Sequence, residues 1–231
     1  MEYEYWDNRS RTFDQDNPYI VGAGLNDEIK AWLQKQFAHT DTVLELGCGT
    51  GAFSEAVAPV VKHLTATDAS EPMLQQASAK LGPYGNIKLQ KQDALHTSFG
   101  EASFDAVFMV NLLHIVPAPE LILEECQRVV KDDGKVIVID VTLRGAPALE
   151  KIGMVIRYVT RWGLPPASNR NMSLDELADL MQEAGFLVQD KILIGKGPRA
   201  ACLTGYKGAL STRAADLSLV EVLKDETKET R

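Results

Sequence analysis

The alternation of strand-like and helix-like segments constrains the fold of this chain more than any other feature of its sequence. Five short runs rich in β-branched residues cover 42–46, 63–68, 87–91, 104–110 and 135–140, and helix-like stretches lie between them. One of these stretches begins at Ser70-Glu-Pro-Met-Leu74, where a capping serine, an acid and a proline stand in the order typical of a helix start. Strands that alternate with helices pair in parallel, so the sequence predicts an α/β fold built on a parallel sheet.

The pattern changes after residue 140, where a segment from 144 to 170 precedes a further helix and two further strands. Ser173 and Glu176 are spaced as a capping box, and this helix is expected to end at Gly185. The two strands are expected at 186–194 and 200–206, and the short connection 195–198 between them leaves no room for a helical crossover. These strands should therefore pair antiparallel.

A glycine-rich loop, Gly47-Cys-Gly-Thr-Gly51, follows the first strand directly. Ligands of α/β proteins bind outside the carboxyl ends of the strands, and glycines there allow positive φ and close approach of the backbone. The loop alone leaves its ligand open, because Gly47, Gly49 and Ala52 also satisfy the dinucleotide pattern G-x-G-x-x-A. A tight turn without a ligand is the structural alternative.

Three acidic residues surround this loop in the predicted sheet. Asp68 ends the second strand, where a carboxylate accepts hydrogen bonds from the ribose hydroxyls of NAD or another nucleoside; it could instead cap a helix. Asp93 follows the third strand and could read the edge of adenine or serve only as a turn residue. Glu45 lies inside the first strand, where a buried carboxylate needs a donor or a cation, such as a ligand ammonium.

The chain resembles the class I S-adenosylmethionine-dependent methyltransferases from about residue 40 to residue 207. The motifs that carry the resemblance are Val43-Leu-Glu-Leu-Gly-Cys-Gly-Thr-Gly51, Thr67-Asp-Ala-Ser-Glu-Pro-Met-Leu74, Gln92-Asp-Ala94, Phe104-Asp-Ala-Val107 and the Asp133-Gly134 turn. This family implies a doubly wound seven-stranded sheet of order 3-2-1-4-5-7-6, mostly parallel with the last strand antiparallel, helices on both faces and a helical cap. The motifs are specific for the cofactor and say almost nothing about the methyl acceptor.

The resemblance also assigns roles to individual residues. It implies that the glycines contact the methionine part of the cofactor, that Glu45 lies near its ammonium, that Asp68 binds the ribose, that Met73 packs on the adenine and that Asp93 with Ala94 reads the adenine edge. The implied product is S-adenosylhomocysteine, and no metal is expected. The cofactor-binding residues implied in this way are Glu45, Gly47, Cys48, Gly49, Gly51, Asp68, Ala69, Met73, Asp93, Ala94, Asn111 and Leu112.

The end of the fourth strand reads Asn111-Leu-Leu-His114, which lacks the Asn/Asp-Pro-Pro-Tyr/Phe loop of family members that methylate an exocyclic base amine. Methyl transfer needs a general base only where the acceptor is protonated at the working pH. His114 is the candidate base, because a histidine with an ordinary pKa of about 6.5 suits that task. A histidine that packs, or binds cofactor without proton transfer, is the alternative.

Basic residues are concentrated in the 144–170 segment, which contains Arg144, Lys151, Arg157, Arg161 and Arg170 against the single acid Glu150. Apolar residues of helical spacing run through it, so an amphipathic cap over the pocket is expected. The predicted substrate residues are Tyr19, Arg157, Arg161 and Trp162. The cap could recognise an anionic apolar acceptor or contact an anionic membrane surface; a sheet-edge cover with solvated arginines is the other interpretation.

The sequence predicts three regions. Residues 1–40 form an aromatic lead and a helix (26–37) that contribute to the site, 41–210 form the methyltransferase domain with the 144–170 insert, and 211–231 form a tail. A net charge of −8 argues against binding duplex nucleic acid by bulk electrostatics. Cys48, Cys126 and Cys202 form no C-x-x-C pair, the start of the chain lacks a basic-then-apolar leader, and no apolar run approaches the length of a membrane span, so a cytoplasmic protein is expected.

The predicted function is therefore methylation of a small molecule by S-adenosylmethionine. An aromatic or amphiphilic acceptor is favoured, and an anionic one is compatible with the basic segment. A protein or RNA methyltransferase, a non-catalytic module that binds adenosyl nucleosides, and an NAD-dependent oxidoreductase are the alternatives. The sequence leaves the acceptor atom, the pathway and the oligomeric state open.

Overall fold

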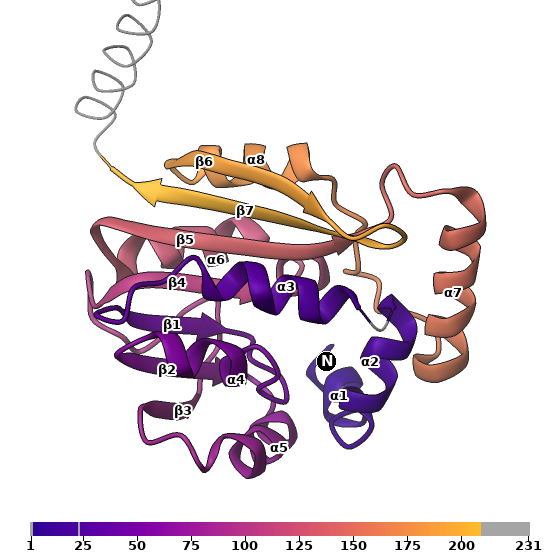
Figure 1. Ribbon diagram of the computed structural model, residues 1–231, viewed down its shortest axis with the longest axis horizontal. Helices are drawn as coiled ribbons and strands as arrows, with labels where there is room; N and C mark the ends of the chain where they lie inside the picture. The colour runs from indigo at the N-terminus through magenta and orange to yellow at the C-terminus, as the bar shows by residue number, and fades with distance from the viewer. Residues whose placement is uncertain (1, 23, 209–231) are drawn as a thin grey trace, which may run out of the picture.

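A seven-stranded sheet of order β3-β2-β1-β4-β5-β7-β6 forms the centre of the molecule in the computed structural model, which describes residues 2–22 and 24–208 (Figure 1). Only β7 runs antiparallel to its neighbours, β5 and β6. The predicted order and the antiparallel pair are confirmed; the predicted tail at 211–231 lies outside the described residues. The strands are β1 Thr42–Leu46, β2 His63–Asp68, β3 Ile87–Lys91, β4 Phe104–Val110, β5 Val130–Thr142, β6 Phe186–Ile194 and β7 Arg199–Lys207.

Strand β5 begins five residues before the predicted start at 135, because a bulge rather than a turn connects its two parts. Its register against β4 shifts between Phe104 and Ala106, and Asp133 takes a positive φ of 62°. A Cβ at Gly134 would come within 2.9 Å of the Asp105 carbonyl oxygen. The predicted Asp133-Gly134 turn is therefore a bulge that only a glycine at 134 fits.

Helices cover both faces of the sheet because buried side chains of the central strands alternate between two apolar clusters. Leu44 of β1 packs in the cluster that contains α6 and α8, whereas Val43 packs in the cluster that contains α3 and α4. Burying a side chain of this size contributes about 1.5–3 kcal/mol. The helices are α1 Glu2–Asp7, α2 Phe13–Val21, α3 Leu25–Gln34, α4 Ser54–Val57, α5 Glu71–Leu81, α6 Pro119–Val129, α7 Ala148–Trp162 and α8 Leu174–Glu183, with short 3-10 turns η1 Ala58–Val60 and η2 Leu113–Ile115.

Local sequence signals set the starts of α5 and α8 as expected. The Ser70 hydroxyl accepts a hydrogen bond from the Met73 N–H, and Ser173 and Glu176 form a complete capping box. The helix expected at 26–37 is α3, which ends at Gln34.

Helices α1, α2 and α7 lie together beyond the end of the sheet toward which the parallel strands point (Figure 1). Their contact is aromatic: Trp162 of α7 is 5% exposed and stacks on Phe13 with ring centroids 5.4 Å apart, while Trp6 meets it edge-on. The N-terminal helices and the cap insert thus form one cover at the end of the sheet where α/β proteins bind ligands.

Candidate functional site

A cavity of about 1020 Å³ lies between the carboxyl ends of the strands and the cover formed by α1, α2 and α7. Apolar aromatic side chains, Trp6, Phe13 and Trp162, line the cover side. Ten of the residues predicted to bind the cofactor line the opposite side, namely Gly47, Cys48, Gly49, Asp68, Ala69, Met73, Asp93, Ala94, Asn111 and Leu112. Glu45 and Gly51 lie behind the wall rather than on it.

The glycine loop adopts the backbone conformation that its composition predicts. Gly47, Gly49 and Gly51 have φ values of +70°, +54° and +80°. A Cβ at Gly47 would come within 2.9 Å of Leu112, and one at Gly51 within 2.8 Å of Leu81, whereas a Cβ at Gly49 would meet no atom within 4 Å. The positive φ values favour glycine at all three positions, the leucine contacts restrict Gly47 and Gly51 further, and Gly49 leaves backbone open to the cavity.

Asp68 connects the glycine loop to the start of α5. Its carboxylate accepts hydrogen bonds from the Gly49 and Ser70 N–H groups, each at 2.8 Å. Burial raises the pKa of Asp68, and the two backbone hydrogen bonds oppose that shift. The helix cap of α5 is Ser70, not Asp68. Each carboxylate oxygen has acceptor capacity left for a ligand hydroxyl, so the residue fits the ribose-binding role.

Glu45 is 1% exposed and accepts a hydrogen bond from the Ser54 hydroxyl at the start of α4. Burial raises the pKa of Glu45 to about 8, and the charge of Asp68 raises it further while Ser54 lowers it. The carboxyl is therefore largely protonated at neutral pH. Its predicted pairing with a ligand ammonium stays a prediction, because Glu45 lies one layer behind the cavity wall.

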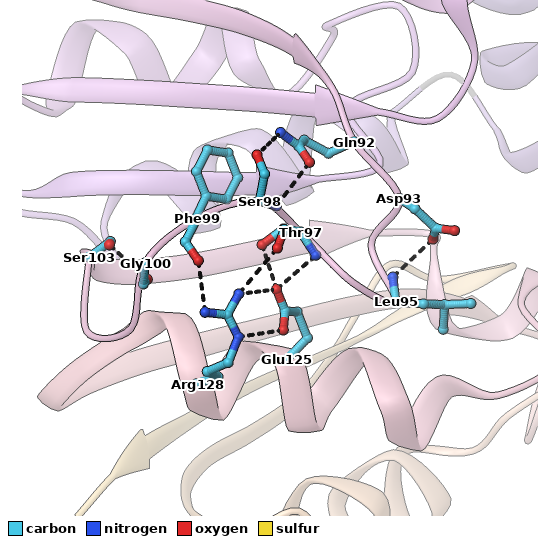
Figure 2. Close-up of polar contacts among 10 residues, drawn as sticks. All are labelled: Gln92, Asp93, Leu95, Thr97, Ser98, Phe99, Gly100, Ser103, Glu125 and Arg128. Carbon is cyan, nitrogen blue, oxygen red and sulfur yellow. Dashed lines mark hydrogen bonds and ion pairs between the residues drawn. The ribbon is translucent and has the colours of Figure 1, made fainter.

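The loop that carries Asp93 is held in place by helix α6 (Figure 2). Glu125 accepts a hydrogen bond from the Thr97 N–H at 2.8 Å, and Arg128 donates to the Phe99 carbonyl at 2.7 Å while pairing with Glu125. Burial acts to raise the pKa of Glu125, but hydrogen bonds from Arg128 and Thr97 outweigh it and lower the pKa. This partly buried ion pair keeps the loop against the sheet.

Asp93 has two roles in the structure: it forms a turn, and it lies on the cavity wall. Its Oδ1 accepts a hydrogen bond from the Leu95 N–H at 3.0 Å, as Figure 2 shows, and the residue lines the cavity wall. The turn function and the predicted reading of adenine are therefore compatible, because the same residue makes the turn and lines the cavity.

His114 lies in η2 on the cavity wall, and its Nδ1 is 2.8 Å from Oδ1 of Asp140. Asp140 is 1% exposed, and its other oxygen, Oδ2, is a buried atom without a hydrogen-bond partner. A carboxylate at Nδ1 fixes the tautomer that carries its proton there, which leaves Nε2 as an acceptor. The loop after α7 holds the histidine, since the Arg170 N–H donates to the His114 carbonyl at 2.8 Å.

Asp140 was not recognised as a site residue in the sequence, where it appears only as the end of the fifth strand. A signal existed: β4 and β5 are parallel neighbours, so polar residues just after or at their carboxyl ends come together. Asn111 illustrates the same rule. It takes a φ of 57°, and its side-chain oxygen accepts a hydrogen bond from the Val141 N–H at 2.9 Å.

The N-terminal helices bind the cofactor-side loops directly, which the sequence did not indicate. The Thr50 hydroxyl donates to Asp14 of α2, and Lys80 pairs with the same carboxylate at 2.8 Å. The Ser70 hydroxyl donates to Asp7 of α1. Both acids attach the cover to the two loops that hold Gly49 and Asp68.

Of the four predicted substrate residues, the structure places Trp162 on the cavity wall and the other three away from it. Arg157 donates from Nε to the Ile20 carbonyl at 3.1 Å. Arg161 pairs with Asp16 at 3.4 Å and lies over the Tyr19 ring, whose side chain is exposed. The two arginines therefore connect α7 to α2, and their predicted clamp on the acceptor stays a prediction.

Within residues 2–22 and 24–208, no cluster of three or more histidine, cysteine or acidic residues has the geometry of a metal site. No helix in those ranges is long and apolar enough to cross a membrane.

Comparison with known proteins finds similarity to methyltransferases. A family model described as a methyltransferase domain matches residues 44–138. The O-methyltransferase cnsE of Penicillium expansum is 25% identical over 206 residues, covering 86% of this chain and 69% of its own. Demethylmenaquinone methyltransferase of Staphylococcus aureus is 29% identical over 189 residues, covering 74% and 77%.

A solved structure shows the same fold. An S-adenosylmethionine-dependent methyltransferase from Thermotoga maritima superposes with a TM-score of 0.66 at 22% identity, covering 87% of this chain and 99% of its own. The region matched by the family model contains the glycine loop, Asp68, Asp93 and His114.

Proposed function

This chain belongs to the class I S-adenosylmethionine-dependent methyltransferases, and on that premise we propose that it methylates a hydroxyl group of an amphiphilic small molecule. The observation that carries the proposal is the pair His114–Asp140 on the wall of the cavity. A base of this kind is useful for an acceptor that holds its proton at neutral pH, as a phenol or alcohol does. Similarity to a protein named as an O-methyltransferase supports the same assignment.

The cofactor would occupy the loop side of the cavity. Gly49 leaves room for it, Asp68 has acceptor capacity for the ribose, and Asp93 with Ala94 faces the position of the adenine. When bound, S-adenosylmethionine supplies a methyl group already activated on a sulfonium, so the protein has mainly to align the acceptor and exclude water. In well-oriented systems, positioning contributes roughly 7–11 kcal/mol to lowering a barrier.

The aromatic side of the cavity would hold the body of the acceptor. Phe13 stacks on Trp162 there, Trp6 meets Trp162 edge-on, and Tyr158 lies against Trp162. With the acceptor hydroxyl near His114, its proton passes to Nε2 as the oxygen becomes nucleophilic, while Asp140 stabilises the imidazolium that forms. Similarity to a protein named demethylmenaquinone methyltransferase supports a small-molecule acceptor for this cavity.

The test is an acceptor screen with labelled S-adenosylmethionine. Matched sets of apolar phenols and alcohols, thiols, amines, peptides and RNA are incubated with the enzyme, and methylated products are identified by mass spectrometry. We expect transfer to oxygen of an apolar hydroxyl compound. Transfer confined to nitrogen, sulfur or carbon, or to peptide or RNA, would refute the proposed acceptor class.

A further inference from the structure

The outer face of helix α7 concentrates the exposed apolar surface of the described chain. Ten large apolar side chains are exposed in the described part of the chain, and six of them lie between residues 149 and 164, five on α7 itself. Leu149, Ile152 and Ile156 follow helical spacing and are 83%, 58% and 57% exposed. We call Leu149, Ile152, Val155, Ile156 and Val159 the α7 face. An apolar patch of this continuity on a protein surface is typical of an interaction site.

The α7 face continues into the cavity. Met154, Tyr158 and Trp162 of the same helix line the cavity from the inside. Val155 and Val159 belong to both surfaces, because they line the cavity and are also 52% and 40% exposed. The cavity thus reaches the surface beside the α7 face. A membrane or protein bound to the α7 face would therefore lie next to the entrance of the cavity.

Positive charge accompanies the α7 face, although the chain as a whole carries −8. The 144–170 segment holds five basic residues and one acid, Glu150. Lys151 is exposed, and the side chain of Arg161 is 52% exposed even while it pairs with Asp16. Arg157 and Arg161 also fix α7 to α2, so the face is presented by an anchored helix.

We propose that the α7 face binds the surface of an anionic lipid membrane, with its apolar side chains in the outer part of the bilayer and the neighbouring Lys151 and Arg161 at the headgroups. An amphipathic helix with basic residues beside an apolar stripe binds membranes in this way. A second copy of the chain fits less well, because a symmetric pairing would bring the same basic residues face to face. The proposal goes beyond the methylation of a hydroxyl, since it concerns where the enzyme lies when the acceptor enters.

The test is sedimentation with lipid vesicles in the absence of acceptor and cofactor. The full chain is mixed at 50 mM NaCl with vesicles of phosphatidylcholine alone or of equal parts phosphatidylcholine and phosphatidylglycerol. We expect binding to the anionic vesicles, weaker binding to the neutral ones, and a marked loss at 0.5 M NaCl, where charges are screened over a few ångströms. Lys151→Glu should weaken binding to the anionic vesicles alone.

Paired variants isolate the apolar contribution. Ile152→Glu with Ile156→Glu should lower the partition onto anionic vesicles at least tenfold, because two charged side chains replace two inserted apolar ones. Leu121→Glu is the matched control: Leu121 is 44% exposed on α6 and should leave the partition within twofold of the unmodified chain. Circular dichroism and affinity for S-adenosylhomocysteine establish that the variants are folded, because neither Ile152 nor Ile156 lines the cavity.

The proposal is refuted if the unmodified chain does not bind anionic vesicles, or if the α7 and α6 variants behave alike. It is equally refuted if ultracentrifugation shows a dimer that the α7 variant dissociates while no vesicle binding occurs, because the face then joins two copies. Vesicle binding is measured without methyl transfer, so failure of the proposed hydroxyl chemistry gives a different result from failure of this proposal.

Discussion

At the scale of single residues, the most consequential contact is the one between His114 and Asp140. Each side chain is ordinary by itself, but the carboxylate has one oxygen on Nδ1 and the other without a hydrogen-bond partner. Such a carboxylate is stabilised by a positive charge on the imidazole, which is the state that a base reaches after it takes a proton. The pair can therefore be tested separately from cofactor binding.

We expect His114→Asn to lower kcat for a phenolic acceptor by about 100-fold or more at neutral pH, the range typical of general base catalysis. The loss should shrink as the pH approaches the acceptor's own pKa of about 10, because the ionised phenol needs no base. Asp140→Asn should give a smaller loss with the same pH trend. The measurement is kcat against pH, with cofactor affinity as the control. A loss that is equal at every pH would mean that His114 only packs.

Glu45 makes stability depend on pH in a direction opposite to that of most acids. Its pKa is raised from 4.5 to about 8 in the folded protein, so the native state holds a proton that the unfolded chain releases. The resulting stabilisation is complete below about pH 4.5 and is lost as the pH rises through about 8.

Glu45→Gln keeps an acceptor for Ser54 and removes this titration. The free energy of unfolding of the variant minus that of the unmodified chain should rise by on the order of 2–4 kcal/mol from pH 5 to pH 9. Urea unfolding of both chains at the two pH values gives the comparison. The other titrating groups contribute equally to both chains, so their contributions cancel in the difference. Parallel pH curves for both chains would show that Glu45 is ionised in the native state.

At the scale of elements, the junction between α7 and α2 decides what the basic residues of the insert do. The aromatic stack of Trp162, Phe13 and Trp6 supplies its buried area. At its edge, Arg157 adds a hydrogen bond to the Ile20 carbonyl, and Arg161 adds a half-exposed ion pair that contributes at most about 1 kcal/mol. Their task in this arrangement is to position the cover.

Replacing Arg157 and Arg161 together by glutamine should therefore weaken acceptor binding to a similar, modest extent for neutral and anionic compounds, with cofactor affinity near that of the unmodified chain. KM for a matched pair of acceptors, one with an added carboxylate, is the measurement. A rise in KM confined to the anionic member would restore the clamp that the sequence suggested. Thermal unfolding of the same variant reports the loss at the junction.

At the scale of the whole molecule, the cover closes the cavity by holding on to the same loops that would bind the cofactor. Asp14 accepts from Thr50 within the glycine loop, and Asp7 accepts from Ser70 beside Asp68. Binding on one side of the cavity is thereby coupled to the order of the helices on the other side, because both share these contacts.

Hydrogen exchange tests this coupling. S-adenosylhomocysteine should slow the exchange of backbone amides in α1 and α2, whereas α8, which packs on the other part of the sheet, should change little. Asp14→Asn should reduce the protection of α2 while the glycine loop stays protected. Protection of the loop alone, with α1 and α2 unaffected in the unmodified chain, would show that the cover is independent of the cofactor side.

The sequence by itself determined the features that depend on neighbours along the chain. The alternation of strands and helices, the caps at Ser70 and Ser173, and the antiparallel pairing across a short connection all follow from local geometry. The glycine loop and Asp68 also belong here, since a loop after the first strand and an acid after the second reach the same edge of a parallel sheet.

Tertiary structure alone decided which face of each helix turns inward and which distant side chains meet. The spacing of Arg157 and Arg161 places them on one side of α7, but the aromatic stack around Trp162 rotates that side toward α2 and away from the cavity. Asp140 reaches His114 across 26 positions of the chain, and Asp14 reaches Thr50 across 36. Such contacts depend on the packing of whole elements, which no local pattern specifies.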